Sequence, residues 1–237
     1  MARKPALSIE KLNDLGAEKL AQMVLAEAEQ NAGFRRQVKA ALAGKSGPEA
    51  IAKLIDRRIS GLERAKSFIE WDKARAFRDD LRSLTDTITT ELGPVAPALA
   101  LDRLLRFIAT HERIFERVDD SSGYVQDVYY QAISAIGDLA QTLSRPEVDL
   151  LPDRIMAALG ESTHGYLADL TAAVAPHLPQ ETLNRWDGDL QKAIADRQAK
   201  EKTRKSDDWF YSMTSQWAGM RQTIATARGD IDLLIEL

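Results

Sequence analysis

LDRLLRFIATHERIFERVDDSSGYVQDVYYQAISAIGDLAQTL, residues 101–143, contains two apolar stripes at helical spacing on either side of a polar turn. Before the turn, apolar residues recur at steps of three, four or seven: Leu101, Leu104, Leu105, Ile108, Phe115 and Val118. After it the same spacing runs from Val125 to Leu143. Steps of three and four place side chains on one face of a helix. The stretch therefore predicts two amphipathic helices, 101–118 and 125–143, joined as a hairpin.

Similar pairs of helical segments can be recognised along most of the chain. Helix signals cover residues 8–28, 34–44, 48–62, 76–92, 181–202 and 207–228, with shorter helices near 155–159 and 166–174. Glycine and proline mark most of the breaks between them. We expect an all-α protein of about ten helices, an array of antiparallel helical hairpins that is solenoid-like in the manner of tetratricopeptide or HEAT repeats.

The array divides where Ser144 and Pro146 interrupt the helical pattern. We expect an N-terminal helical array over residues 1–143 and a C-terminal helical region over residues 144–237, continuous with the first. The chain ends on an apolar run, 233–237. These residues either pack inward as a terminal cap or continue into further helices of a longer protein.

Composition excludes several classes of protein. The chain has no cysteine, so it contains neither disulfides nor thiolate metal sites. Its longest apolar stretch, 95–101, is far shorter than the roughly 20 residues that a membrane helix needs. The first residues lack the apolar run of a signal peptide. We therefore expect a soluble, cytoplasmic protein without a membrane partner.

The three histidines do not form a recognisable catalytic or metal-binding pattern. A zinc-protease helix needs a second histidine four residues after His111, but Phe115 occupies that position. We expect His111 and Glu112 to be exposed residues on a helix surface. His164 and His177 lie in turn-like contexts without a neighbouring nucleophile motif. The sequence thus predicts no catalytic residue, no metal, no cofactor and no enzymatic activity.

The acidic turn of the central hairpin has a structural explanation. A calcium loop with Gly123 as its sixth residue would place Val118 first and Tyr129 twelfth, so both required carboxylates are missing. Instead, the Asp and Ser side chains of the turn, among them Asp119 and Asp120, are expected to accept N–H groups at the start of the next helix, while Gly123 permits the backbone turn.

Basic residues are concentrated in one part of the chain. Residues 35–82 contain thirteen Lys or Arg against seven Asp or Glu, a net charge of +6, although the whole chain has a net charge of −4. Such a patch could neutralise nucleic-acid phosphates. The interleaved acids instead favour a solvated helix face with ion pairs between neighbouring turns. The candidate basic patch consists of Arg57, Arg58, Arg64, Arg75, Arg78 and Arg82.

An aromatic and methionine stripe lies near the C-terminus. Trp209, Met213, Trp217, Met220 and Ile224 follow one another at steps of four, four, three and four. Such side chains are enriched in binding grooves, but they also form ordinary helix–helix contacts. We favour packing in the core; if the stripe binds a partner instead, Trp209, Met213 and Trp217 are the candidate partner-binding residues.

Three segments carry a family resemblance: Leu12–Leu42, RVDDSSGYVQD at 117–127, and ARGDIDLLIEL at 227–237. Together they resemble an uncharacterised bacterial α-helical repeat family, a domain of unknown function whose related helical regions occur beside SWIM-type zinc fingers. The resemblance implies the fold and no activity. Without cysteine, this chain cannot itself hold such a finger.

These observations predict an interaction scaffold that binds a protein or peptide partner on stacked helices. Nucleic-acid binding through the basic region 35–82 is the alternative. It requires the cations to converge on one face, separated from the acids.

Overall fold

The computed structural model describes residues 7–160, 162, 165–201 and 213–236. Over these residues the chain is helical, with one isolated β-bridge, so the all-α prediction is confirmed. The fourteen α-helices exceed the predicted number because α1, α7, α9 and α14 are only five or six residues long, too short to show a period. The elements are α1 (Ile9–Asn13), α2 (Ala17–Gln30), α3 (Ala32–Gly44), α4 (Pro48–Arg64), α5 (Trp71–Thr87), π-helix η1 (Ile88–Leu92), α6 (Pro97–Ile108), α7 (His111–Phe115), α8 (Tyr124–Ala140), α9 (Arg145–Asp149), α10 (Leu151–Leu159), α11 (Tyr166–Val174), 3-10 helix η2 (Ala175–His177), α12 (Gln180–Glu201), α13 (Met213–Arg228) and α14 (Ile231–Glu236).

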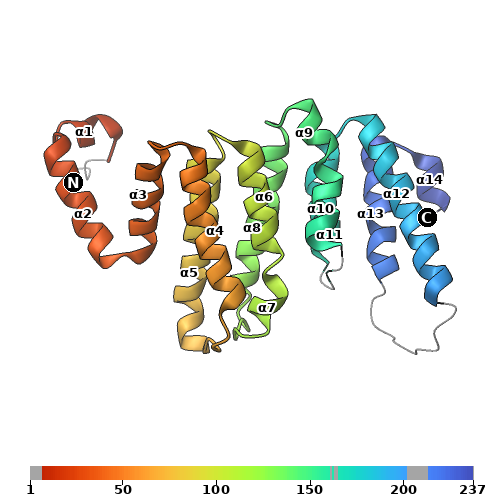
Figure 1. Cartoon of the computed structure of the whole chain (residues 1–237), viewed down its shortest axis with the longest axis horizontal. Helices are drawn as coiled ribbons and strands as arrows, with labels where there is room; N and C mark the ends of the chain where they lie inside the picture. The colour runs from red at the N-terminus through yellow and green to blue at the C-terminus, as the bar shows by residue number, and fades with distance from the viewer. Residues whose placement is uncertain (1–6, 161, 163–164, 202–212, 237) are drawn as a thin grey trace, which may run out of the picture.

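The helices stand side by side in a row along the longest axis of the molecule (Figure 1). The row runs from α2 at one end to α12, α13 and α14 at the other. Consecutive helices α2 and α3, α3 and α4, and α12 and α13 pack on one another, and α3 also packs on α5. The central helix α8 packs against α5, α6 and α11.

The first half of the central hairpin is not one helix, so the prediction of a continuous helix to Val118 is wrong. α6 ends at Ile108 and the short α7 begins at His111. Two side chains form hydrogen bonds with backbone carbonyls at the end of α6. The Thr110 hydroxyl donates to the Phe107 carbonyl at 2.6 Å, and Nδ1 of His111 lies 2.9 Å from the Ile108 carbonyl oxygen. Such side-chain bonds compete with the helical ladder and end it here.

One hydrophobic cluster extends from Ala40 to Ile224. It therefore continues across the predicted boundary at residues 143/144. At its centre, the rings of Phe107 and Tyr129 stack at 4.8 Å between centroids, and Tyr129 stacks on Tyr166 at 5.9 Å. These stacked rings join α6, α8 and α11 into a single core.

Among the described residues, no helix has both the length and the apolar character required to cross a membrane.

Candidate binding groove

A groove lies where α3, α4 and α5 meet. Its volume is about 310 Å³, at the lower end of the range for ligand pockets. Aliphatic side chains form the floor and cations form the rim. The lining residues are Arg36, Lys39 and Ala40 from α3, Leu54, Ile55, Arg57 and Arg58 from α4, and Ser83, Leu84 and Thr87 from α5.

Helical spacing explains why α3 and α4 both contribute cationic and apolar side chains to the groove. On α3, two cations and a small apolar residue occupy positions 36, 39 and 40, which share one helix face. On α4, Leu54, Arg57 and Arg58 repeat the steps of three and four. Each helix therefore directs a cationic and apolar strip into the space between them.

The α5 side chain of Asp80 bridges two of the rim cations. Its carboxylate forms ion pairs with Arg36 of α3 and Arg58 of α4, which ties the three helices together. Burial lowers the pKa of both guanidinium groups, and repulsion between Arg36 and Arg58 lowers the pKa of Arg58 further. One carboxylate thus balances part of the positive charge of Arg36, Lys39, Arg57 and Arg58.

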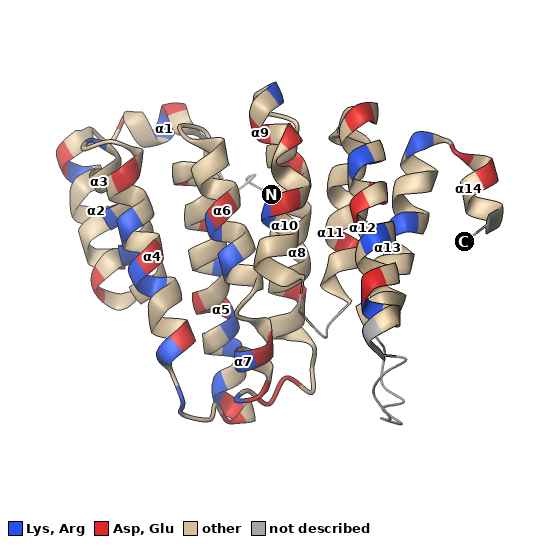
Figure 2. Cartoon of the chain, turned by 45° about the vertical axis from the view of Figure 1, so that its right-hand side comes forward, with Lys and Arg blue, Asp and Glu red and all other residues tan. Residues whose placement is uncertain are grey.

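Two of the three acids of α4, Asp56 and Glu63, pair with cations of α6, whereas Glu49 lies exposed in the first turn of α4. Arg106 binds Glu63 at 2.8 Å and Asp56 at 3.3 Å, and Arg103 binds Asp56 at 2.9 Å. The hydrogen bond with Glu63 is the main cause that raises the pKa of Arg106. Figure 2 shows basic and acidic positions along α4 and α6. Asp56 and Glu63 are therefore paired on the α6 side of α4, while Arg57 and Arg58 line the groove on the α3 side.

The six arginines of the candidate basic patch are distributed over more than one place. Arg57 and Arg58 line the groove, whereas Arg64 lines a second hollow of about 690 Å³ with Lys66, Arg113, Arg117, Glu63 and Glu116. Arg78 pairs with Asp79 at 2.6 Å, and its guanidinium lies 5.4 Å from the centre of the Tyr124 ring. Arg75 is exposed and Arg82 is half-buried near Asp86.

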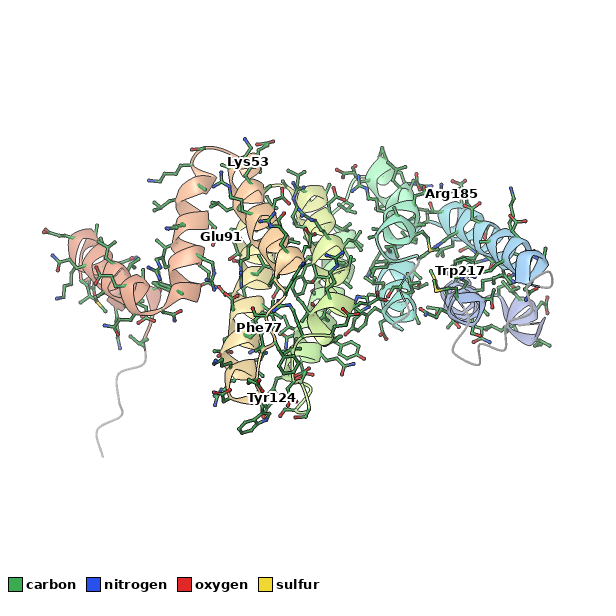
Figure 3. The ribbon with its side chains drawn as sticks, turned by 60° about the horizontal axis from the view of Figure 1, so that its bottom comes forward. Lys53, Phe77, Glu91, Tyr124, Arg185 and Trp217 are labelled. Carbon is green, nitrogen blue, oxygen red and sulfur yellow. The ribbon has the colours of Figure 1, made fainter. Side chains whose placement is uncertain are left out.

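Exposed aromatic side chains surround the lower ends of α4 and α5. Phe68 and Trp71 are 57% and 65% exposed, and Tyr124 is 46% exposed at the start of α8. Figure 3 shows Tyr124 at the outer edge of this end, with Phe77 nearby. The isolated bridge between Ile69 and Val118 fixes the two turns to each other.

A comparison with protein families places this chain. A family model described as a family of unknown function, DUF6880, matches residues 2–237. The chain belongs to the DUF6880 family. Comparison with the curated proteins and with the solved structures gave no match. The resemblance found in the sequence is thus confirmed as membership of a family of unknown function.

The structure describes only part of the C-terminal aromatic stripe of this DUF6880 chain. Trp209 lies outside the described residues. Met213 and Trp217 are each 7% exposed and belong to the hydrophobic core. Trp217 lies close to α12 (Figure 3), where the Arg197 guanidinium is 5.7 Å from the centre of its ring. The described part of the stripe therefore packs inward and offers little surface to a partner.

His111 is buried, so the expectation of an exposed histidine is wrong. Its side chain is 1% exposed and stands edge-on to the Tyr166 ring, 5.1 Å between centroids. Nε2 lies 3.1 Å from the Ser162 hydroxyl. His111 is the first residue of α7, and its ring also stands edge-on to the Tyr129 ring of α8, 6.4 Å between centroids. His177 is exposed, and His164 lies outside the described residues.

Asp120 accepts N–H groups at the start of α8 and Gly123 permits the turn, as predicted, whereas Asp119 does not reach the helix. The Asp120 carboxylate accepts from the backbone N–H groups of Val125 at 3.0 Å and Gln126 at 3.0 Å, and Gly123 adopts a φ of 71°. Asp119 accepts from the Ser121 N–H at 3.2 Å. Within the described residues no group of three or more His, Asp or Glu side chains could hold a metal ion.

Sequence reasoning missed the floor of the groove and two of its cations. Arg36 and Lys39 belong to the basic region 35–82 but not to the candidate patch. The shared spacing of 36, 39, 40 and of 54, 57, 58 was the available signal. That these two strips face each other follows only from the packing of α3 on α4.

Proposed function

We propose that this DUF6880 chain is a helical-repeat scaffold, with a solenoid-like arrangement of hairpins, that binds a protein or peptide partner. The observation that carries the proposal is the groove between α3, α4 and α5, whose floor is aliphatic and whose rim is cationic. Protein interfaces place their strongest contacts in such apolar hollows, surrounded by polar groups that exclude water. Stacked helices are well suited to display a surface of this kind.

Nucleic-acid binding through the basic region is a second candidate. Exposed Phe68 and Trp71 lie in the chain between Lys66 and Lys73, and bases stack readily on such rings beside cations. The resemblance to helical regions beside SWIM-type zinc fingers does not support this candidate, because a chain without cysteine cannot hold such a finger. Against it, Asp56 and Glu63 share the α4 helix with the cations, and the groove floor has no aromatic ring.

Affinity capture with the full chain separates the two candidates. The bait is exposed to lysate of the source cell at low and at raised salt, with and without nuclease, and the bound protein and nucleic acid are both identified. A stoichiometric protein that stays bound at raised salt and after nuclease treatment supports the scaffold. Nucleic acid that is released by raised salt, with no accompanying protein, contradicts it, because phosphate contacts weaken steeply with salt.

A further inference from the structure

The floor of the groove is shaped for an aliphatic side chain. Ala40 is 1% exposed at the bottom, where its single methyl group leaves space that a larger residue would fill. Ile55 and Leu84 are buried beside it, and Leu54 is half-buried. The groove volume of about 310 Å³ is too small to receive part of a folded protein, but it holds one or two large side chains of a peptide.

The rim supplies more positive charge than the groove itself neutralises. Lys39 and Arg57 are exposed, and neither forms an ion pair within the part of the chain that the structure describes. Arg36 and Arg58 share the one carboxylate of Asp80. None of the lining residues is acidic. An entering carboxylate would therefore meet two exposed cations without an ion pair and two part-buried arginines that share one carboxylate. Each of these cations can form charge-assisted hydrogen bonds with it.

We propose that this groove binds an acidic peptide segment, with a leucine-like or isoleucine-like side chain on the floor and flanking Asp or Glu side chains on the rim cations. The inference rests on the proposed scaffold function and names the chemistry of its partner. Charge complementarity selects the acidic flanks, and the aliphatic floor selects the anchor. A nucleic acid satisfies only the first of these requirements, since base stacking needs aromatic surfaces.

The test is selection of peptides from a random 12-residue display library on the immobilised full chain. The peptides recovered are then titrated by fluorescence anisotropy against three proteins: the natural chain, the groove variant Lys39→Glu/Arg57→Glu, and the control variant Lys53→Glu/Lys192→Glu. Lys53 and Lys192 are exposed cations of α4 and α12 outside the groove lining, so both variants change the net charge equally. Thermal unfolding confirms that each variant is folded.

The proposal predicts enriched peptides with a large aliphatic residue between acidic ones. Their affinity falls about tenfold or more in the groove variant, because two charged contacts are reversed, and changes little in the control variant. Equal losses in both variants overturn the groove assignment, since only overall charge then matters. Neutral or basic peptides that bind both variants overturn the partner chemistry while the scaffold stands. If no peptide is recovered, and a 20-nucleotide single strand binds instead, the scaffold itself is wrong.

Discussion

Asp120 illustrates how one side chain determines the start of the central helix α8. Its carboxylate accepts from two backbone N–H groups of the first turn, whereas Asp119 accepts only from Ser121 in the preceding turn. Loss of an N-cap costs about 0.5–2 kcal/mol. We expect Asp120→Ala to lower the free energy of unfolding by about 1 kcal/mol, measured by urea denaturation. Asp119→Ala serves as the control and should lower the free energy of unfolding clearly less. An equal loss in the two variants would contradict a capping role of Asp120.

The Asp120 contacts also show what residue-level reasoning can reach. A helix cap is made by residues close together in the chain. The mismatch with a calcium-binding loop, together with the Asp and Gly residues of the turn, was therefore sufficient to predict the cap. The burial of His111 was not predictable in this way. It depends on the break between α6 and α7 and on Tyr166, which lies more than fifty residues later in the chain.

Helix α9 begins with a capping interaction that depends on pH. The Glu147 carboxylate accepts from the backbone N–H of Ser144 at 2.8 Å and from its hydroxyl at 2.7 Å. These bonds lower the pKa of Glu147 below its ordinary value of 4.5. Because the pKa is lower in the folded state, the stabilisation is present above pH 4.5 and is lost as the pH falls through the folded pKa.

We expect Ser144→Ala to return the pKa of Glu147 toward 4.5 and to lower stability at neutral pH by about 1 kcal/mol. NMR titration of the Glu147 side chain measures the first effect and denaturation at pH 7 the second. An unchanged pKa in the variant would mean that Ser144 does not hold this carboxylate.

Packing of α8 on α11 depends on a glycine. A Cβ atom at Gly137 would lie 2.8 Å from the backbone oxygen of Ala173, so the two helices must separate to accommodate it. At Gly188, in α12, a Cβ atom would meet no atom within 4 Å. Gly137→Ala should therefore destabilise the protein by about 1–3 kcal/mol. Gly188→Ala should stabilise it by about 0.5–1 kcal/mol, through helix propensity alone. Urea denaturation measures the free energy of unfolding of both variants. An increase in both variants would contradict a close contact between α8 and α11 at Gly137.

At the scale of the whole molecule, the sequence was sufficient for the helical class and insufficient for the groove. Amphipathic spacing is a property of one segment, so long helices such as α4, α8 and α12 could be predicted from it. The groove depends on the meeting of α3, α4 and α5, and on Asp80 bridging Arg36 and Arg58. Such contacts join residues far apart in the chain and leave no periodic signal.

The same argument applies to the candidate sites. The basic region 35–82 was correctly recognised as rich in cations, but these cations do not share one site. Arg57 and Arg58 line the groove, whereas Arg64 lines another hollow. The Met213 and Trp217 stripe has the spacing of both a groove and a core. Only its burial distinguishes them.

The central claim is that a partner binds on the face formed by α3, α4 and α5. Hydrogen–deuterium exchange of the full chain, alone and saturated with the most strongly enriched acidic peptide, tests it most directly. We expect slower exchange in residues 36–40, 54–58 and 83–87, and unchanged exchange in α12 and α13. Slower exchange confined to α12 and α13, or to the aromatic end at Phe68 and Trp71, would contradict the claim.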